Sequence, residues 1–395
     1  MYLSDSPSRR LPAAIPRRLA ITALAVLAVA ATLVTPISGS AAGAASATSG
    51  PAAAAAAAGW LAARVTADGY VPDALGDPSP GDTLQTSLAL ATAGVGYDAF
   101  HRTLVWLGAN VDAVTGTGTS ADPGQIAYLL IVIDAAGGDA TNFGGVDLVA
   151  RLDSTLGGFE PGLFGGADPT YDGVFRQSLA IIGLDAVGET PPVEATNWLI
   201  AQQCGTSDPN VRGGWEAYRL VADACTAGST ATFTGVDTNS TAIATTALAA
   251  IDREPTYGTQ PWFVAVQNST GGWGYLQGLD DDPNSDALVI QAITATGASA
   301  TATPFVLPGG DPLASLLSFQ LGADADPADQ GAFTFPGSDG APNVLATEQA
   351  TWGAMPRAFP LGLVAFSDAP VATTTTTAPG ATPAAAVETT SHFTG

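Results

Sequence analysis

The chain has 395 residues, of which 46% are hydrophobic and only 12% are charged. This composition is too apolar for a disordered chain and supplies enough apolar side chains for a large buried core. The formal net charge is −24 and no lysine is present, so the surface should repel nucleic acids, and chemistry that needs a lysine is excluded.

The first 47 residues have the features of a secretion signal. Four arginines fall within the first 18 positions, an apolar run follows at 19–34, and Ala45-Ser46-Ala47 matches an A-x-A cleavage site. The run is shorter than the roughly 20 residues that span a bilayer, so we expect no transmembrane segment in the mature chain. We therefore predict a signal peptide at 1–47 and an extracellular protein, either secreted or associated with the cell envelope. General and twin-arginine export both stay open.

Composition divides the rest of the chain into three parts. Residues 48–58 are rich in alanine and are predicted to form a linker. Residues 59–368 carry almost all the large apolar side chains and are predicted to be the folded domain. Residues 369–395 are rich in Thr, Pro and Ala, which predicts a disordered tail that is either a natural end or a truncated surface stalk.

A repeated pattern runs through the predicted domain. An apolar helix ends near a glutamine, a turn of two glycines and an aromatic residue follows, and a second helix of small residues comes after a polar loop. The clearest copies lead from Gln203 to Trp215 and from Gln267 to Trp273, and weaker copies include Phe159 and Phe333. A fixed period of about 45 to 60 residues indicates a repeat architecture. We expect the turn aromatics to brace one repeat against the next.

The second helix of each repeat is apolar on nearly every face, so other helices should enclose it. Each of these helices opens near an acidic or amide side chain that is suited to capping. Six helical hairpins of this kind close naturally into an all-α fold, an α/α toroid with two walls, whereas an open solenoid is the alternative. The capping residues would then form the rim of a central cavity: Asp82, Asp122, Asp172, Asp237, Asp286 and Asn343.

Cys204 and Cys225 are the only cysteines. In an exported protein a lone pair of cysteines is expected to form a disulfide. A metal pair is the competing interpretation, and no histidine lies near to complete it.

The spacing of Trp262, Gln267, Gly271 and Trp273 resembles the QW repeat of squalene and oxidosqualene cyclases. The architecture of those enzymes also serves protein prenyltransferase β subunits, complement thioester domains and cobalamin carriers related to transcobalamin. The stretch 143–152 and the surroundings of both cysteines resemble secreted bacterial proteins with prenyltransferase/squalene-oxidase-type repeats. The resemblance covers about residues 59–365 and implies the toroid, but one fold hosts many activities.

The catalytic residues of these families are not found intact. The D-x-D-D acid motif of squalene-type cyclases has its nearest counterpart at Asp280-Asp281-Asp282-Pro283, where proline replaces the last acid. The prenyltransferase zinc site requires histidine, and His101 is the only histidine in the predicted domain. The reactive Cys-Gly-Glu-Gln of thioester domains is also missing. We therefore expect no complete catalytic set, no resident metal and no cofactor.

One acidic loop suggests a calcium site, in contrast to the expectation of no resident metal. Asp280, Asp282, Asn284 and Asp286 offer oxygen ligands at alternate positions, as in calcium-binding loops. The fit is partial, because Ser285 occupies the position that favours glycine. A solvated acidic turn, with Asp286 as a helix cap, is the alternative.

These observations favour a secreted or surface-displayed module that binds a ligand without catalysis, with an unknown small molecule or a surface or protein partner. An enzyme acting on a terpenoid or prenyl lipid, like a cyclase or a transferase, is the first alternative. A carrier of a corrinoid-type cofactor is the second. The sequence alone does not identify the ligand.

Overall fold

The computed structural model describes residues 49–166 and 169–370. The predicted signal peptide and all but the first two residues of the predicted tail lie outside these ranges. Thirteen α-helices form in the described residues. Six belong to an inner wall: α2 (Pro80–Ala93), α5 (Pro123–Ala136), α7 (Val174–Ala186), α9 (Thr238–Ala250), α11 (Pro283–Ala295) and α13 (Val344–Ala354). Seven belong to an outer wall: α1 (Gly50–Ala62), α3 (Tyr97–Ala109), α4 (Val111–Thr115), α6 (Leu148–Asp153), α8 (Val193–Ala201), α10 (Gln260–Val266) and α12 (Pro312–Leu317).

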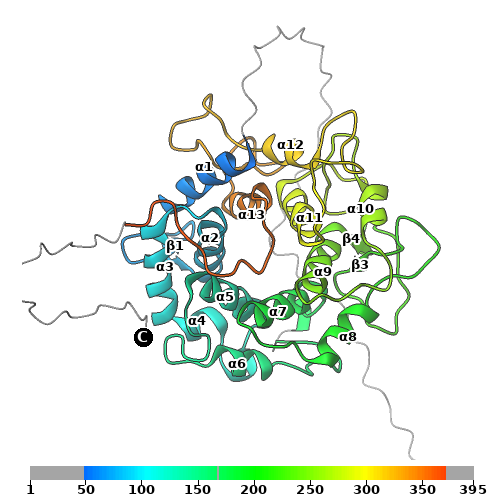
Figure 1. Cartoon of the computed structure of the whole chain (residues 1–395), viewed down its shortest axis with the longest axis horizontal. Helices are drawn as coiled ribbons and strands as arrows, with labels where there is room; N and C mark the ends of the chain where they lie inside the picture. The colour runs from blue at the N-terminus through cyan, green and yellow to red at the C-terminus, as the bar shows by residue number, and fades with distance from the viewer. Residues whose placement is uncertain (1–48, 167–168, 371–395) are drawn as a thin grey trace, which may run out of the picture. The chain divides into compact units, whose positions relative to one another are not determined.

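The inner helices form a closed ring. Each packs on the next in chain order, and α13 packs back on α2 (Figure 1). Outer helices alternate with inner helices along the chain, as the hairpin pattern predicts. The prediction of an all-α toroid is confirmed, and the open solenoid is wrong. Strand structure in the described residues is limited to two short antiparallel ribbons: β1 (Val71–Pro72) with β2 (Pro78–Ser79), and β3 (Trp215–Glu216) with β4 (Val236–Asp237).

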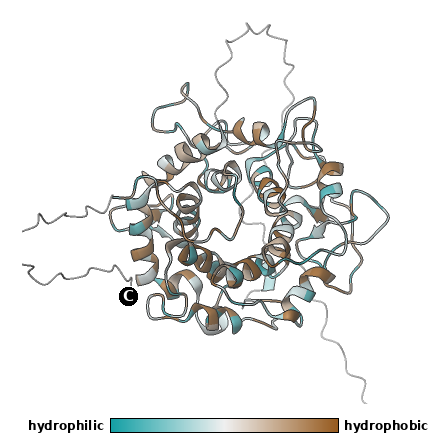
Figure 2. Ribbon diagram, in the orientation of Figure 1, coloured by the Kyte–Doolittle hydropathy of each residue, from teal (hydrophilic) through white to brown (hydrophobic). Residues whose placement is uncertain are grey.

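Small residues allow the inner helices to approach one another closely. A Cβ atom added to Gly353 of α13 would lie 2.5 Å from the Cα of Ala287 on α11. A Cβ added to Gly183 of α7 would lie 2.9 Å from the carbonyl oxygen of Ala127 on α5. The inner ring carries mainly hydrophobic and neutral residues, whereas the loops around it contain many hydrophilic ones (Figure 2). The inner helices consist mainly of small, apolar residues, so other helices can pack against almost every side of them.

The repeated glutamines hold consecutive repeats together. The side chain of Gln267 donates to the carbonyl oxygens of Gly271, in its own turn, and of Phe305, in the following repeat. Gln203 donates in the same way to Gly213 and Tyr257.

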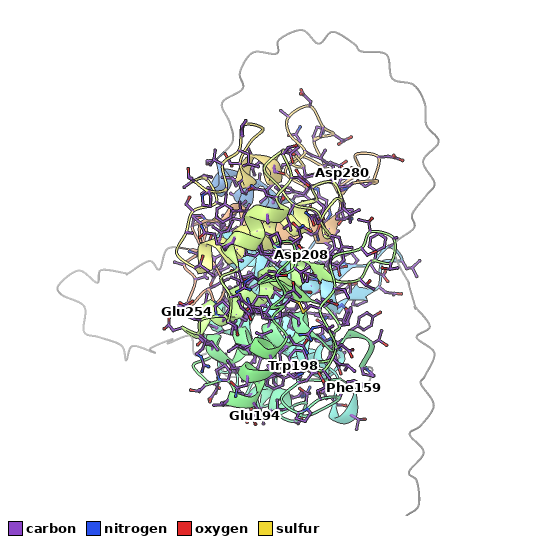
Figure 3. All side chains as sticks on the ribbon, turned by 90° about the vertical axis from the view of Figure 1, so that its right-hand side faces the viewer. Phe159, Glu194, Trp198, Asp208, Glu254 and Asp280 are labelled. Carbon is purple, nitrogen blue, oxygen red and sulfur yellow. A yellow bond between two sulfur atoms is a disulfide. The ribbon has the colours of Figure 1, made fainter. Side chains whose placement is uncertain are left out.

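The turn aromatics are mostly buried, as expected of bracing residues. Trp215 and Trp273 are fully buried, and each indole N–H donates to a carbonyl oxygen of the preceding outer helix, at Leu199 and Phe263 respectively. Phe159 differs, because its side chain is 64% exposed at the outer surface (Figure 3).

The segment 48–58, predicted to be a linker, is instead part of helix α1 from Gly50 onward. Ala53, Ala54, Ala57 and Ala58 are fully buried against the neighbouring helices. Alanine has the highest helix propensity, and its small side chain suits the close packing already described. The alanine run therefore forms the first outer helix and is not a flexible linker.

The C-terminal segment, residues 355–370, crosses the C-terminal ends of the inner helices (Figure 1). Gln291 of α11 donates to the carbonyl oxygen of Arg357. Further along, the backbone N–H of Val364 donates to Ala135 at the end of α5, and the carboxylate of Asp368 accepts from the backbone N–H groups of Gly96 and Tyr97. This segment covers part of one end of the ring.

The predicted disulfide between Cys204 and Cys225 is present. It ties the end of the repeat that contains α8 to the long loop before α9. None of the helices in the described part of the chain has the length and apolar character that a bilayer crossing requires.

Candidate functional site

The N-terminal ends of the inner helices lie opposite the end that the C-terminal segment covers. Outer helices cover the outside of the ring, yet Gln125 and Asn239 in the first turns of inner helices, and Gln85 in the second turn of α2, are only partly buried. Leu345, in the first turn of α13, is 41% exposed. The N-terminal ends of the inner helices are therefore in contact with solvent.

Glu348 lies one helical turn deeper than Leu345 on α13 and is fully buried. The hydroxyl of Thr86 on α2 donates to its Oε1 at 2.7 Å, while its Oε2 has no hydrogen-bond partner in the protein. Burial raises the pKa of this carboxyl group well above its usual value, and the negative charge of Asp82 raises the pKa further. Burial thus favours the protonated, neutral form of the Glu348 side chain.

Two aromatic side chains lie near this acid, since Trp352 follows it by one turn on α13 and Tyr128 is within electrostatic range of its carboxyl group. The rings of Tyr128 on α5 and Trp352 on α13 are 6.1 Å apart. Because α2 separates α5 from α13 in the ring, this contact crosses the interior. Phe359 of the C-terminal segment packs edge-on against Trp352 at 5.5 Å. The interior is therefore closed at this depth by aromatic rings. Burial also raises the pKa of the Tyr128 hydroxyl, so it stays neutral.

Several buried polar atoms of the inner helices have no hydrogen-bond partner within the protein. They come from α5, α9, α11 and α13, and they are Gln125 Oε1, Asn239 Oδ1, Asn284 Oδ1, Glu348 Oε2 and Trp352 Nε1. An unsatisfied buried polar group costs about 1–3 kcal/mol, and native proteins usually pair such groups with water or a ligand. The polar lining of the inner helices is therefore suited to hold a molecule that supplies the missing partners.

An arginine links two of the predicted rim residues. Asp122 caps α5 by accepting from the backbone N–H groups of Gly124 and Gln125. Arg176 of α7 contacts Asp122 Oδ2 at 2.7 Å and Asp172 Oδ1 at 3.0 Å. Asp172 does not cap α7, since Gly173 occupies the capping position. These two acids are therefore held by a shared arginine at the N-terminal ends of neighbouring helices.

Three other rim residues lie at helix starts, in two different roles. Asp237 caps α9 and Asn343 caps α13, each by accepting from a backbone N–H three residues later. Asp82 lies in the first turn of α2, where Ser79 is the capping residue instead. Burial raises the pKa of Asp237 to about 7, so a fraction of this carboxyl group is protonated near neutral pH.

Asp286 was predicted to cap its helix, and this prediction is wrong. Helix α11 begins at Pro283 with Asp282 as its cap, so Asp286 lies inside the helix. Its Oδ1 accepts from the backbone N–H of Trp273 at 2.6 Å, and its Oδ2 lies 2.7 Å from the hydroxyl of Ser315 on α12. Asp286 thus ties a bracing turn and an outer helix to the inner wall. Ligand binding by the six rim residues stays a prediction.

The four residues suggested for calcium do not form one ligand set. Asp280 is exposed on an outward loop (Figure 3), Asp282 caps α11 through Ser285, and Asn284 donates to Gln349 on α13. Helix formation from Pro283 turns the alternate side chains to different faces, which the sequence spacing alone did not reveal. Within the described residues, the ligand atoms that gather closely belong to Cys204, Glu216 and Cys225, and both cysteines are in the disulfide.

Sequence reasoning missed Glu348, Tyr128, Trp352 and Arg176 as site residues. One signal was available for Glu348, because it is the only acidic residue in the eleven residues of α13. A lone acid in an otherwise enclosed helix is unusual, since ionisable groups are rarely fully buried without a partner. Its position relative to α2 could be recognised only once the ring had closed.

The sequence matches no known protein family, and no curated protein is significantly similar to it. Similar solved structures include a variant of a type II terpene cyclase from Scytonema in complex with its substrate geranylgeranyl dihydroxybenzoate, at 14% identity and a TM-score of 0.49 over 77% of this chain and 96% of that one. A protein from Actinoplanes matches at 14% identity and a TM-score of 0.48, over 77% of this chain and 98% of that one. An ent-copalyl diphosphate synthase from Streptomyces platensis matches at 17% identity and a TM-score of 0.42, over 71% of this chain and 51% of that one. These structures include terpene cyclases, one of the families that the repeat motif resembles.

Proposed function

We propose that the protein acts on an unsaturated, isoprenoid-like molecule inside the ring, with Glu348 as the proton donor. The buried carboxyl group of Glu348 supports this proposal, because burial favours its protonated form, its Oε2 has no protein partner, and the side chains of Tyr128 and Trp352 lie near it. The sequence alone favoured an interior without reactive groups. Glu348 gives the enzyme alternative a residue that could carry out chemistry.

The proposed reaction is a proton transfer to an alkene. The Oε2–H bond of Glu348 breaks, the alkene π electrons form a C–H bond, and a carbocation and a carboxylate result. This step requires a neutral acid in a site from which water is excluded. The faces of Tyr128 and Trp352 would stabilise the positive charge that develops. Loss of a proton from the final carbocation restores the acid, so no co-reactant is needed.

The charges of the inner wall favour this chemistry over ionisation of a diphosphate. Arg176 is the only basic residue on the six inner helices, and it is already paired with Asp122 and Asp172. Binding a diphosphate usually requires several basic groups or metal ions. An uncharged polyene therefore fits the interior better than a prenyl diphosphate.

A turnover assay with a matched pair of variants tests the proposal. The full-length protein would be incubated with squalene and with geranylgeranyl-substituted arenes, and products would be analysed by gas chromatography and mass spectrometry. Glu348→Gln keeps the size of the side chain and an acceptor for Thr86 but removes the proton. Glu254→Gln removes an acid from the outer surface (Figure 3).

We expect cyclised or isomerised products from the wild type and from Glu254→Gln, and a loss of at least about 100-fold in Glu348→Gln, in line with the usual contribution of a general acid. Equal turnover by both variants would exclude Glu348 as the proton donor. No product from any polyene tested would refute the enzymatic proposal and favour binding without catalysis.

Binding without turnover is the second candidate, favoured by the unpartnered polar atoms of the inner helices. Native mass spectrometry of protein purified from its own host would reveal a retained ligand, and a visible absorption spectrum would reveal a corrinoid. In either case we propose an extracytoplasmic location. The disulfide between Cys204 and Cys225 supports it, because disulfides persist mainly in oxidising compartments.

A further inference from the structure

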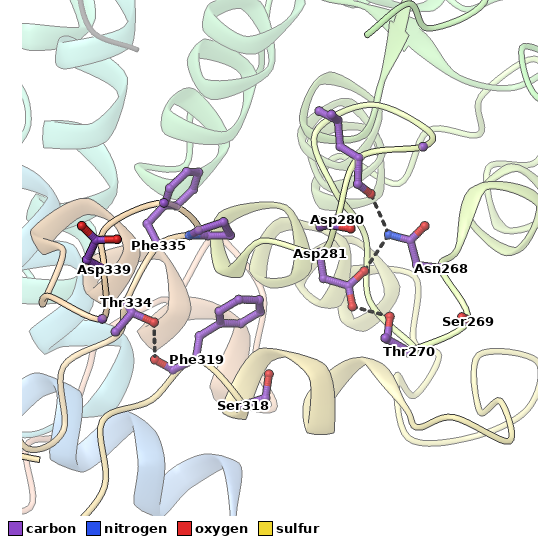
Figure 4. A pocket seen from close by; sticks show the side chains of 15 residues that line it. Asn268, Ser269, Thr270, Asp280, Asp281, Ser318, Phe319, Thr334, Phe335 and Asp339 are labelled. Atoms are coloured by element: carbon purple, nitrogen blue, oxygen red, sulfur yellow. Dashed lines mark hydrogen bonds between the residues drawn. The ribbon is translucent and has the colours of Figure 1, made fainter. Parts of the chain in front are cut away.

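A hollow of about 820 Å³ lies outside the inner ring, among the loops at one side of the molecule (Figure 4). One wall is the loop between α10 and α11, at residues 268–270 and 278–281. The other wall consists of residues 318–319 after α12 and the loop at 334–340 before α13. A volume of this size lies within the range of small-molecule sites. The proposed reaction in the ring interior does not use this hollow.

The lining of the hollow combines negative charge with aromatic rings. Asp280 and Asp281 lie on one side and Asp339 on the other, and the rings of Phe319 and Phe335 lie between them (Figure 4). No arginine or histidine is among the lining residues. Carboxylates supply charge to a cation, and aromatic faces attract cationic groups through their quadrupole. This combination selects for a positively charged organic molecule and against an anion.

Asp281 is held in place by three side-chain donors. Its Oδ1 accepts from Asn268 at 2.6 Å, and its Oδ2 accepts from the hydroxyls of Thr270 and of Ser315, the latter at 3.0 Å. The carboxylate is therefore positioned before any ligand arrives, which reduces the entropy cost of binding.

Ser315 also lies 2.7 Å from Asp286 Oδ2, but a serine hydroxyl has only one proton to donate. The Ser315 hydroxyl is therefore shared between the carboxyl groups of Asp281 and Asp286. Asp286 is itself anchored by the backbone N–H of Trp273, so Asp281 is connected through Ser315 to the inner wall.

We propose that this hollow is a binding site for a small organic cation that carries an ammonium group. A bare metal ion fits less well, because three donors already occupy most of the lone pairs of Asp281 and the aromatic rings would have no role. A polyol could use the hydroxyls and carboxylates, but it would gain little from the charge of the three acids.

Calorimetric titration of the full-length protein with choline tests the proposal. The comparison ligand is 3,3-dimethylbutan-1-ol, which has the same shape as choline without the charge. The double variant Asp280→Asn/Asp339→Asn changes only exposed loop residues, so it should fold normally. Phe335→Leu removes an aromatic face while keeping an apolar side chain. Asp324→Asn, an exposed acid outside the hollow, is the control for charge.

We expect saturable choline binding that is at least about tenfold weaker in the double variant and measurably weaker in Phe335→Leu, as loss of charge and cation–π contacts implies. Asp324→Asn should bind like the wild type. Equal binding of the uncharged alcohol, unchanged binding by the double variant, or no saturation with choline would overturn the proposal. Displacement of choline by calcium, together with full binding by Phe335→Leu, would indicate a metal site instead. Because turnover in the ring is measured separately, failure here leaves the proposed function untouched.

Discussion

Asp237 shows how far burial can change the role of a capping residue. It is 1% exposed, it caps α9, and its Oδ2 has no partner in the protein. Because burial raises its pKa to about 7, the folded state keeps a proton that the unfolded chain releases near pH 4. The contribution of a protonated Asp237 to stability is therefore fully present below pH 4 and is lost as the pH rises to about 7.

This linkage predicts a pH-dependent difference between the wild type and Asp237→Asn. Asparagine also caps helices but does not titrate. Relative to this variant, the free energy of unfolding of the wild type should fall by up to about 4 kcal/mol between pH 4 and pH 8, since one pKa unit corresponds to about 1.4 kcal/mol. Urea unfolding at several pH values would measure the difference. A difference that stays constant across this range would show that Asp237 keeps its ordinary pKa.

The residues that the sequence identified correctly are those whose roles are local. Asp122, Asp237 and Asn343 cap helices that begin directly after them, so their capping hydrogen bonds span two or three residues. The contact between Glu348 and Thr86 spans 262 residues. No local pattern encodes such a pairing, which is why the candidate site in the interior was not predicted.

Among the elements, the inner helices depend on close approach at their small residues. Gly353 faces Ala287 with no room for a methyl group, whereas Gly59 on the outer helix α1 has nothing within 4 Å of an added Cβ. The same substitution should therefore have opposite effects at the two positions. Gly353→Ala should lower the midpoint of thermal unfolding, because α13 must move away from α11, at a cost of about 1–3 kcal/mol.

Gly59→Ala is the matched control on an exposed helix face. It should raise stability by about 0.5–1 kcal/mol, the usual gain when alanine replaces glycine inside a helix. Circular dichroism on heating would measure both variants. If Gly353→Ala were as stable as the wild type, the inner wall would be looser than the distances indicate.

The prediction of elements succeeded where periodicity and composition agreed, and failed where they did not. The inner helices are long, and their small apolar residues continue over three turns, so each was recognisable. Helix α1 was missed because the composition of an alanine run does not distinguish a buried helix from a linker. The deciding contact, in which Gln320 donates to the carbonyl oxygen of Ala53, joins the two ends of the domain.

At the scale of the whole molecule, the closure of the ring makes the first and last elements neighbours. Helix α1 packs on both α2 and α13, and α13 packs on α2 (Figure 1). In an open solenoid each repeat contacts only the repeats beside it, so the ends can unfold separately. In a closed ring every repeat has a neighbour on both sides. Separating two neighbouring repeats exposes the buried surface of each to water.

Ring closure therefore predicts one cooperative unfolding transition for the folded domain. Urea unfolding followed by far-ultraviolet and near-ultraviolet circular dichroism should give the same midpoint, because helices and buried tryptophans are lost together. Gln320→Ala, which removes the bond to α1, should lower that midpoint without separating the two signals. The exposed Gln277→Ala, outside the ring closure, should leave the midpoint nearly unchanged. Two distinct transitions in the wild type would mean that α1 and α2 unfold independently, and that the contact between the ends contributes little to stability.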